Sequence, residues 1–431
     1  MSNITITKTN GGLGRRLPTQ DHISGIIFYN NYIPSGWLID VLSWVTGTAY
    51  VVGDKVYDPT SKNYYIANTA HTASASFSTD VAKWTDYKKT ALSFKTIEEI
   101  EAKGILKGST DHTYEWYQLS EYFRINPDGE IYVYIAKVPV SSYSYNEVLE
   151  IQDQAFGVLR QIAVFAKDAI FASAEVDKIQ LHANTLEGLY TPAQIVFNAK
   201  YSSLTISTLP DMATLSTAAS NVSVNLLGDG NAYGSTLAYN GNIGAVLGAM
   251  SKAKVNESIA WVEKFNLAST ELDKPSITEL SLVEDLTESQ KDTLNEKHYI
   301  FGLKRTGTTG TYLNDSWTSD SIVSDYNDIQ LNRTYHKAFR GIRTNLLPLL
   351  NSPLRLNKNG TLSAGTVTAF KNATSITLFD MMNNGELSAY SVNIDPSQNV
   401  LADSTVRIDV RIVPYGTARE IRVTLGYTAS L

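Results

Sequence analysis

The sequence predicts a multidomain protein of the α/β (α+β) class: a layered α/β body, a small all-β insertion, and a C-terminal domain made of a helix and a β-hairpin. Three observations predict this class. Strand and helix patterns alternate through most of the chain, residues 44–88 have no helical period, and the last hundred residues open on an amphipathic helix and close on two alternating strands. With 431 residues, 43% of them hydrophobic, the chain can fill two or three cores.

The body is predicted from elements that alternate in type. They are a strand at 26–29, helices at 96–103 and 112–124, a strand at 130–136, a helix at 147–161, a strand at 162–165, a helix at 209–220 and a strand at 222–227. Gly104 and the run Asn126-Pro127-Asp128-Gly129 supply the stops that end the first two helices. This order favours a layered α/β body over residues 21–43 and 89–330.

Residues 44–88 are dense in turn residues and aromatic side chains, and we expect them to form a small β module. The pattern W…G-x-x-Y-x-x-G-D-x-V-Y…Y-Y-x-A…H-T-A…W resembles small β domains related to chitin-binding modules. That resemblance implies a glycan site in which Trp44, Tyr57, Tyr65 and Trp84 stack on sugar rings. The other interpretation, which we favour, is that these aromatic residues are the module's own core, because a domain this small has little else to bury.

A long amphipathic helix is predicted at the start of the C-terminal domain, residues 331–431. One stripe of this helix is apolar and contains Tyr335, Phe339, Ile342 and Leu346. A second, basic stripe lies beside it and contains Arg333, Lys337, Arg340 and Arg343. Either these four cations are solvated on a surface helix, or they form a face that binds an acidic partner.

Two alternating strands are predicted close to the C-terminus. Their apolar positions are Val406, Ile408, Val410 and Ile412 before the turn at Pro414-Tyr415-Gly416, and Ile421, Val423 and Leu425 after it. At the other end of the chain, Ile4 and Ile6 alternate with threonines, and Gly11-Gly12-Leu13-Gly14 separates this stretch from the body.

A short strand on a glycine tether needs a sheet edge to join, because an isolated two-stranded pairing is marginal in water. We therefore expect residues 1–20 to form an arm whose Ile4 and Ile6 pair with the sheet of the C-terminal strands. Pairing within one molecule and pairing between neighbouring molecules both fit the sequence. Only the second joins subunits by strand addition.

Three motifs lie between Met381 and Tyr427: M-x-x-x-G-E-L-S-x-Y, V-x-I-D-P-x-Q-N-V-L-A-x-S-T and V-P-x-G-T-A-R-E-I-x-V-x-L-G-Y. Together they resemble the C-terminal domain of contractile tail sheath proteins, which form the contracting sleeve of myophage tails, tailocins and contractile injection systems. The resemblance implies a structural subunit that polymerises around an inner tube by strand exchange and contracts to drive the tube through a target envelope.

The same resemblance implies the partners and the location of the protein. The partners are further copies of the chain, the inner tail tube protein, and baseplate and tail terminator proteins. Because the C-terminal domain of such proteins faces the tube, Arg333, Lys337, Arg340 and Arg343 are expected to contact it. Assembly is expected in the bacterial cytoplasm, and the finished subunit in a virion tail or injection particle.

Charge and composition exclude several other classes. Residues 331–431 carry 11 Lys+Arg against 6 Asp+Glu, whereas the preceding 330 residues carry 25 against 37. The cations are scattered without a basic run, so an acidic protein surface fits them better than nucleic acid does. No apolar run could span a membrane, the first residues lack a secretory pattern, and there is no cysteine.

No motif predicts an enzyme, a cofactor or a metal. The loop from Gly228 to Gly234 invites a phosphate-loop interpretation, but its spacing is not G-x-G-x-x-G and no Gly-Lys-Ser/Thr follows. The six histidines are scattered, with no His-x-x-x-His pair. The main alternative to a structural subunit is a carbohydrate-binding surface protein that acts through residues 44–88.

Overall fold

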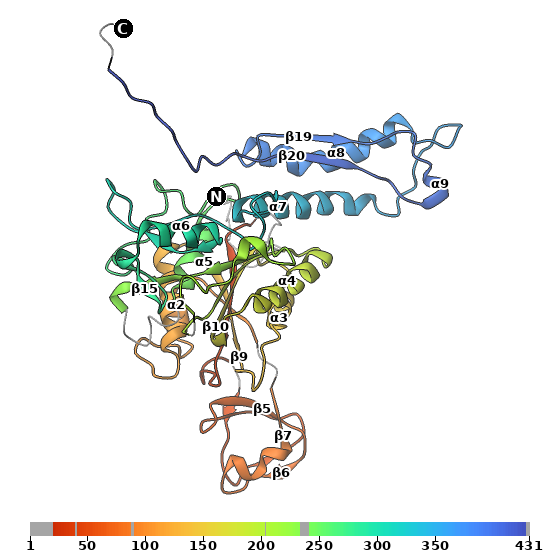
Figure 1. Ribbon diagram of the computed structural model, residues 1–431. Coiled ribbons are helices and arrows are strands. Elements are labelled where there is room, and N and C mark those ends of the chain that lie inside the picture. The colour runs from red at the N-terminus through yellow and green to blue at the C-terminus, as the bar shows by residue number, and fades with distance from the viewer. Residues whose placement is uncertain (1–19, 39–40, 88–89, 203, 233–240, 428–431) are drawn as a thin grey trace, which may run out of the picture. The chain divides into compact units, whose positions relative to one another are not determined.

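The computed structural model describes residues 20–38, 41–87, 90–202, 204–232 and 241–427. The chain divides into two compact units, Met1–Arg340 (unit 1) and Gly341–Leu431 (unit 2). Helix α7 (Ile329–Leu346) crosses this division. Helices and strands occur in both units (Figure 1), so the mixed α/β class predicted from the sequence is confirmed.

Unit 1 is organised around a seven-stranded sheet with the strand order β16-β12-β11-β10-β1-β9-β8. Its strands are β1 (Ile23–Tyr29), β8 (Leu92–Phe94), β9 (Glu130–Ala136), β10 (Gln161–Ile170), β11 (Gln194–Lys200), β12 (Val222–Asn225) and β16 (Tyr299–Ile300). All neighbours pair in parallel except β8 with β9. Every residue of the interior strand β1 is buried, as expected of a parallel strand covered on both faces.

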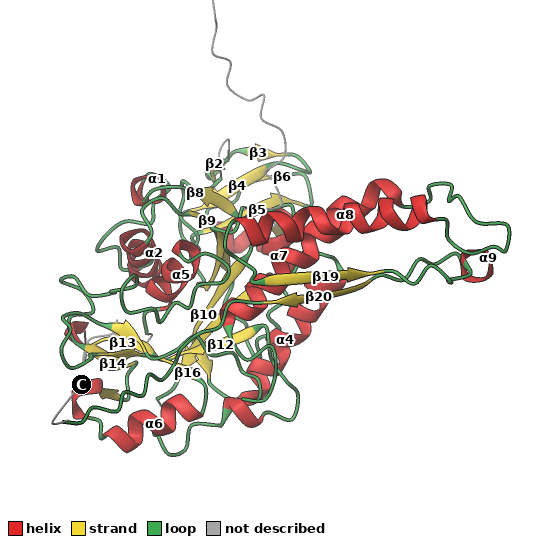
Figure 2. Cartoon of the chain, turned by 90° about the horizontal axis from the view of Figure 1, so that it is seen from above, coloured by secondary structure: helices red, strands yellow, loops and turns green. Residues whose placement is uncertain are grey.

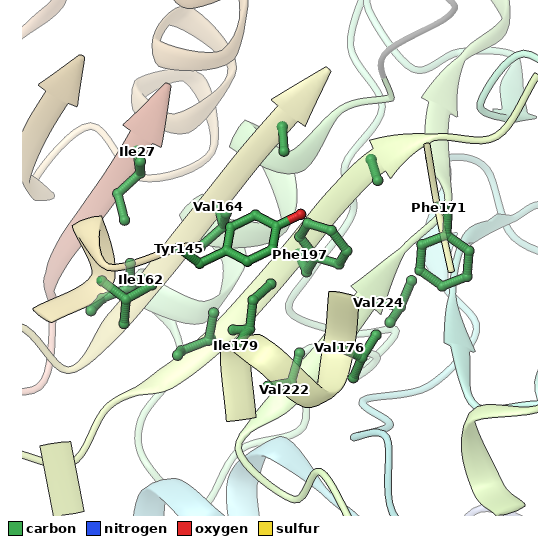
Figure 3. Close-up of a cluster of buried hydrophobic side chains, with 14 of the residues drawn as sticks. Ile27, Tyr145, Ile162, Val164, Phe171, Val176, Ile179, Phe197, Val222 and Val224 are labelled. Atoms are coloured by element: carbon green, nitrogen blue, oxygen red, sulfur yellow. The ribbon is translucent and has the colours of Figure 1, made fainter. Parts of the chain in front are cut away.

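Helices cover both faces of this sheet and create two cores. They are α1 (Ile97–Glu101), α2 (Thr113–Ile125), α3 (Glu147–Gln154), α4 (Ser173–Gly188), α5 (Ile243–Lys252) and α6 (Glu288–Glu296). On one face, Ile27 and Val164 of the sheet pack with Ile179 of α4, as Figure 3 shows. On the other face, Ile26 packs with residues of α2 and α5 such as Leu119.

Two of the predicted body helices differ from the structure. The helix predicted at 147–161 ends at Gln154, because Phe156 and Gly157 adopt positive φ angles. The helix predicted at 209–220 is wrong: only a short 3₁₀ turn, Met212–Thr214, forms there. The Asp211 side chain accepts a hydrogen bond from the Ala213 backbone at 2.9 Å and holds this turn. Helix α4 and strand β11 were not predicted.

Smaller sheets complete unit 1. One is built from β13 (Leu227–Asp229), β14 (Pro275–Ile277) and β15 (Ser281–Leu282), and another from β17 (Gly302–Leu303) and β18 (Tyr312–Leu313). Gly228 and Asp229, the start of the glycine loop, therefore belong to an antiparallel strand, and residues 233–240 lie outside the described residues. This placement agrees with a structural role for the loop.

The inserted module is a separate β structure on the same unit. Strands β2 (Leu42–Ser43), β4 (Lys55–Asp58), β5 (Asn63–Ala67) and β7 (Trp84–Asp86) form one sheet, and β3 (Ala49–Tyr50) pairs with β6 (His71–Thr72). A 3₁₀ turn, Phe77–Lys83, precedes β7. The module is fastened to the body by Tyr64, whose hydroxyl donates to the Pro34 carbonyl at 2.9 Å, and by the ion pair of Lys62 with Asp111.

Unit 2 is a long helix covered by two strands. Its elements are the end of α7, α8 (Ala364–Asn383), β19 (Ala389–Asn393), α9 (Val400–Asp403) and β20 (Asp409–Val413). Strands β19 and β20 pair antiparallel, with Ala389 opposite Val413 and Asn393 opposite Asp409 (Figure 2). Helix α8 packs on β19, and Leu378 and Met381 of the helix and Val392 of the strand are buried.

The last turns of α7 approach α8 so closely that only glycine fits at position 341. A Cβ added there would lie 2.2 Å from Thr377 Cγ2, and Asn345 Nδ2 donates to Thr377 Oγ1 at 2.9 Å one turn later. We expect Gly341→Ala to destabilise unit 2 by about 1–3 kcal/mol, because the β-branched Thr377 cannot rotate away. Urea unfolding, monitored by the hydrogen exchange of the α8 amides, measures this loss of stability.

Gly365, at the exposed start of α8, is the matched control. A Cβ there would meet only the Ser363 hydroxyl, at 4.0 Å. Gly365→Ala should leave unit 2 as stable as before or stabilise it by up to about 1 kcal/mol, as expected of alanine in an open helix position. Equal effects of the two substitutions would contradict the proposed close packing of α7 on α8.

Candidate assembly surface

The C-terminal segment, residues 414–427, is extended and exposed. Ile421, Val423 and Leu425 each expose at least 81% of their surface, and these are the apolar positions of the second predicted strand. Within the part of the chain that the structure describes, none of the residues 414–427 belongs to a strand. The predicted hairpin of 406–412 with 421–425 is therefore wrong for the single chain.

The partner of β20 is β19, which the sequence analysis did not predict. The signal for β19 is short: Tyr390, Val392 and Ile394 alternate, and Val392 and Ile394 are buried. Val410 and Ile412 of β20 are half-buried, and so are Val406 and Ile408 just before it. Ile4 and Ile6, the predicted N-terminal strand, lie outside the described residues.

A glutamine side chain extends the pairing of β20 upstream of the strand. The backbone of Arg407 donates to Gln398 Oε1 at 2.7 Å, and Gln398 Nε2 donates back to the Arg407 carbonyl at 2.9 Å. Residues 406–408 are thus held in line with β20, although their neighbour is a side chain. The result is a two-stranded sheet, a size that is marginal on its own in water.

Helix α7 places its basic side chains inside unit 1 and not on its surface. Arg333, Lys337 and Arg340 are at most 7% exposed, so the prediction of an exposed basic stripe is wrong for these three residues, whereas Arg343 is half-buried. The reason is Asp21 of the distant N-terminal region. Its carboxylate lies 2.7 Å from Lys337 Nζ and 3.2 Å from Arg340, a pairing that offsets the cost of burying these charges.

Other groups complete this buried cluster. Arg333 donates to the backbone carbonyls of Asp21 at 3.3 Å and Ala253 at 3.1 Å. Burial, together with the charges of Arg340, Arg333 and Arg160, lowers the pKa of His336 to about 3, so this histidine is neutral at pH 7. The cluster fixes α7 to the body and has the character of a structural site.

The aromatic residues of the inserted module form its core. Trp84 and Tyr65 are 6% and 9% exposed, and the ring of Phe77 lies 5.5 Å and 4.5 Å from theirs. Trp44 is half-buried against the same Phe77, with 5.9 Å between ring centroids. Tyr57 is buried and donates to the Ile33 carbonyl of the body at 3.2 Å. The glycan-stacking interpretation is therefore wrong for Tyr57, Tyr65 and Trp84, which are buried, whereas Trp44 stays partly exposed.

A polar group that the sequence analysis did not single out fills the carboxyl end of the parallel sheet. Asn30, directly after β1, donates to Glu115 Oε1 at 2.8 Å and lies 3.4 Å from His112 Nδ1. The chain leaves β1 toward β9 and leaves the neighbouring strand β10 toward β11, so the connections diverge here, and α/β sheets commonly bind ligands at such a point. Here the position is occupied by side chains: Glu115 is 1% exposed and His112 4%.

Burial changes the protonation of both groups. It raises the pKa of Glu115 to about 7 and lowers the pKa of His112 to about 4. Around them lie Asp111, Asp168 and Lys167, and Lys167 favours the charged form of Glu115 while Asp168 opposes it. A carboxyl group with a raised pKa stabilises the fold below its unfolded-state pKa, and that contribution is lost as the pH rises through about 7.

The raised pKa of Glu115 predicts how the stability of the protein depends on pH. Because glutamine keeps the acceptor for Asn30 without the buried charge, Glu115→Gln should gain about 2–3 kcal/mol of stability relative to the wild type between pH 5 and pH 9. Denaturant unfolding across this pH range measures the gain. Glu263→Gln, at an exposed position, is the control and should show no such trend. A pH-independent difference for Glu115→Gln would contradict the raised pKa.

Neither a metal centre nor a membrane-spanning helix is found among the described residues. They contain no group of three or more His, Asp or Glu side chains arranged to hold a metal ion. Among the helices of the same residues, none has both the length and the hydropathy needed to cross a membrane.

Family models match most of the chain. The model described as DUF2586, N-terminal domain, matches residues 57–317, and the one described as DUF2586, C-terminal domain, matches residues 325–431. No curated protein matches the sequence at a significant level.

Solved structures of contractile particles have a similar fold. The helical sheath of the anti-feeding prophage in its contracted state aligns with a TM-score of 0.53 and 14% identity over 99% of this chain and 100% of that one. The contracted sheath complex of an extracellular contractile injection system, PVC, aligns with a TM-score of 0.53 and 12% identity over 99% of each chain. The six-fold symmetrised baseplate of the anti-feeding prophage contains a chain with a TM-score of 0.53 and 13% identity, over 98% of this chain and 100% of that one. These likenesses show the fold.

Proposed function

The chain belongs to the DUF2586 family and has the fold of contractile sheath proteins, and from that premise we propose that it is a structural subunit of a contractile sheath. Subunits polymerise around an inner tube and stay joined by β-strand exchange while the sheath contracts. Contraction drives the tube through a target envelope. Baseplate proteins and tail terminator proteins contact the two ends of the polymer. Assembly takes place in the bacterial cytoplasm.

The observation that carries this proposal is the exposed C-terminal segment beside an incomplete sheet. Its apolar side chains alternate with Glu420, Arg422 and Thr424, so one face of a strand formed by residues 421–427 is apolar and the other polar. The sheet of β19 and β20 has only two strands. A segment from one copy added to the sheet of another supplies both with what they lack.

A single strand exchange between two copies is weak, and many such contacts in a polymer are strong together. Burying the four exposed apolar side chains of residues 421–427 contributes about 6–12 kcal/mol, at about 1.5–3 kcal/mol each. Ordering the seven backbone residues costs about 7–14 kcal/mol, at about 1–2 kcal/mol each. The two terms nearly cancel, and backbone hydrogen bonds add about 0.5–1.5 kcal/mol each. Assembly is therefore cooperative, because each copy gains by several contacts at once.

The N-terminal arm, residues 1–20, is proposed to add a further strand through Ile4 and Ile6. It enters the body at Asp21, whose carboxylate is fixed to Lys337 and Arg340 of α7. Tension on the arm would therefore reach the helix that leads into unit 2. The contact with the tube is proposed to involve the half-buried Arg343 together with Lys358 and Lys371, which are exposed on unit 2.

Negative-stain electron microscopy of the purified full chain over a range of concentrations tests the proposed function. We expect hollow tubes or stacked rings in the absence of any ligand. A monomer that stays dispersed at high concentration contradicts the proposal. The alternative of a carbohydrate-binding protein predicts that monomer, together with binding of chitin oligosaccharides, and it has no support from the buried module aromatics.

A further inference from the structure

Two neighbouring helices of unit 1 end on exposed aromatic residues in the left-handed backbone conformation. After α3, Phe156 has φ 55° and is 85% exposed, and after α4, Tyr190 has φ 62° and is 47% exposed. Both helices close with the paired hydrogen bonds of a Schellman motif: Gly157 N donates to the Gln152 carbonyl at 2.8 Å, and Thr191 N to the Leu186 carbonyl at 2.9 Å. Glycine is the usual residue at the position that Phe156 and Tyr190 occupy.

An aromatic side chain at this position costs stability, and the Phe156 ring, which is 85% exposed, recovers little of that cost by burial within the described chain. Left-handed backbone at a non-glycine residue costs on the order of 1–3 kcal/mol, and such strain concentrates at functional sites. The two helix ends lie against each other, because Gln152 Nε2 donates to the Thr191 carbonyl at 2.8 Å. The two residues therefore lie on one local part of the surface, and the strained, exposed ring of Phe156 points to an interaction partner.

These two residues belong to a larger apolar surface, which we call the aromatic patch: Phe156, Leu189, Tyr190, Tyr326, Tyr335 and Phe339. Four of its rings form a chain of contacts. Tyr190 stacks on Phe339 with 6.0 Å between centroids, Phe339 lies 6.0 Å from Tyr335, and Tyr335 lies 5.5 Å from Tyr326. The patch exists because α7 buries its basic face and turns Tyr335 and Phe339 outward.

Acidic side chains border the aromatic patch. Asp153 precedes Phe156 by three residues, Asp325 directly precedes Tyr326, and both carboxylates are exposed. Glu187 accepts a hydrogen bond from the Tyr335 hydroxyl at 3.1 Å. An apolar surface with an acidic border fits a partner that is apolar at its centre and basic around it.

A pocket elsewhere on unit 1 has this character. It measures about 380 Å³, including the part open to solvent, and is lined by Lys274, Pro275, Val283, Glu284, Lys291, Leu303 and Lys304. Three apolar side chains form the lining together with three lysines and one glutamate. Two of the lysines also have acidic neighbours, since Lys291 lies 2.8 Å from Glu288 and Lys304 3.4 Å from Asp273. The pocket is at the small end of ligand sites and suits one or two side chains.

We propose that the aromatic patch of one copy docks into the lysine-bordered pocket of a second copy, with Phe156 entering the pocket. This inference deepens the proposed function and rests on it. In Figure 1, α3 and α4 lie on one flank of unit 1, and α6, which contributes Lys291 to the pocket, lies on the other. A contact between two different surfaces of the same chain repeats head to tail and builds rings or helical polymers. It joins the bodies of the subunits, whereas the terminal strands join their C-terminal units.

Phe156→Asn separates assembly from stability. Asparagine tolerates the left-handed conformation, so the monomer should unfold at the same or a higher denaturant concentration. Assembly should require a protein concentration about tenfold higher or more, because a large exposed ring is lost from the contact. Val52→Asn, at a 65% exposed apolar position of the inserted module, is the matched control and should assemble as the wild type does.

Cysteine cross-linking tests the contact directly, because the chain has no cysteine of its own that would also react. A full-length Gly188→Cys/Asp285→Cys variant keeps Phe156 and the three lysines, and places one exposed cysteine beside the patch and the other beside the pocket residue Glu284. Treated with a short bis-maleimide, it should give a ladder of dimers, trimers and higher species. A Gly188→Cys/Ser78→Cys variant, with the second cysteine on the module, should not. Polymers that form without the ladder, or that tolerate Phe156→Asn at wild-type concentration, overturn the patch-to-pocket contact alone. Absence of polymer from the wild-type chain overturns the proposed function and this contact with it.

Discussion

Removing residues 414–431 is expected to abolish ordered polymer and to leave both units folded. Residues 414–427 are exposed and belong to no strand within the described chain, so their loss removes no packing from either core. What is lost is the strand that each copy is proposed to add to its neighbour's sheet. Electron microscopy should show no tubes, and sedimentation should show a monomer. The thermal unfolding of this monomer should match that of the full chain.

The period of a strand provides a sharper test than truncation. Serine at Ile421, Val423 and Leu425 removes the apolar face of the segment. Serine at Glu420, Arg422 and Thr424 changes only side chains of the polar face and leaves the apolar face intact. We expect the first triple variant to lose assembly and the second to keep it. Equal behaviour of the two variants would show that the segment does not act as a strand with a buried side.

Asp21→Asn is expected to destabilise unit 1 by about 3–5 kcal/mol. The change leaves Lys337 and Arg340 buried without the carboxylate that lies 2.7 Å and 3.2 Å from them, and an uncompensated buried charge is costly. Because α7 is anchored to the body by this cluster, its first turns should exchange amide hydrogens faster than those of α2. Denaturant unfolding together with hydrogen exchange measures both effects.

Asp325→Asn is the matched control for this substitution. Asp325 is exposed, and its replacement should change the stability by less than about 0.5 kcal/mol. If Asp21→Asn costs no more than this control, the buried ion pair is not what fixes α7. Lys337→Met alone should cost less than Asp21→Asn, since Asp21 then keeps Arg340 as its partner.

Local sequence patterns were sufficient to predict a helix or strand where its own residues determine that it forms. Strands β1 and β9 and helix α2 appear where apolar alternation and the stop at Asn126–Gly129 predict them. The interior role of the module aromatics followed from size, because a small domain must bury its few large side chains. The helix predicted at 209–220 failed because Asp211 forms a turn that competes with the helix.

Long-range pairing was beyond the reach of these patterns. The alternation in 406–412 and 421–425 identifies two strands but not their partners, and the observed partner of β20 is β19. Likewise, four cations on one helix suggest a surface, since buried charge is costly. Only the fold brings Asp21, more than 300 residues away, against Lys337 and Arg340 and reverses that conclusion.

The same limit applies to the aromatic patch. Phe156 and Tyr190 come from different helix ends and Phe339 from a third helix, so no single stretch of sequence reveals them as one surface. The local signal is an aromatic residue where a helix end favours glycine. That signal has meaning only once both helices are known to end side by side.

A cryo-electron microscopy reconstruction of the assembled polymer, at a resolution that traces the backbone, is the most direct measurement of strand exchange between copies. We expect residues 421–427 of one copy to form a strand on the β19–β20 sheet of a neighbouring copy, with Ile421, Val423 and Leu425 facing inward. A polymer in which this segment folds back onto the sheet of its own chain, or remains exposed, would contradict this expectation.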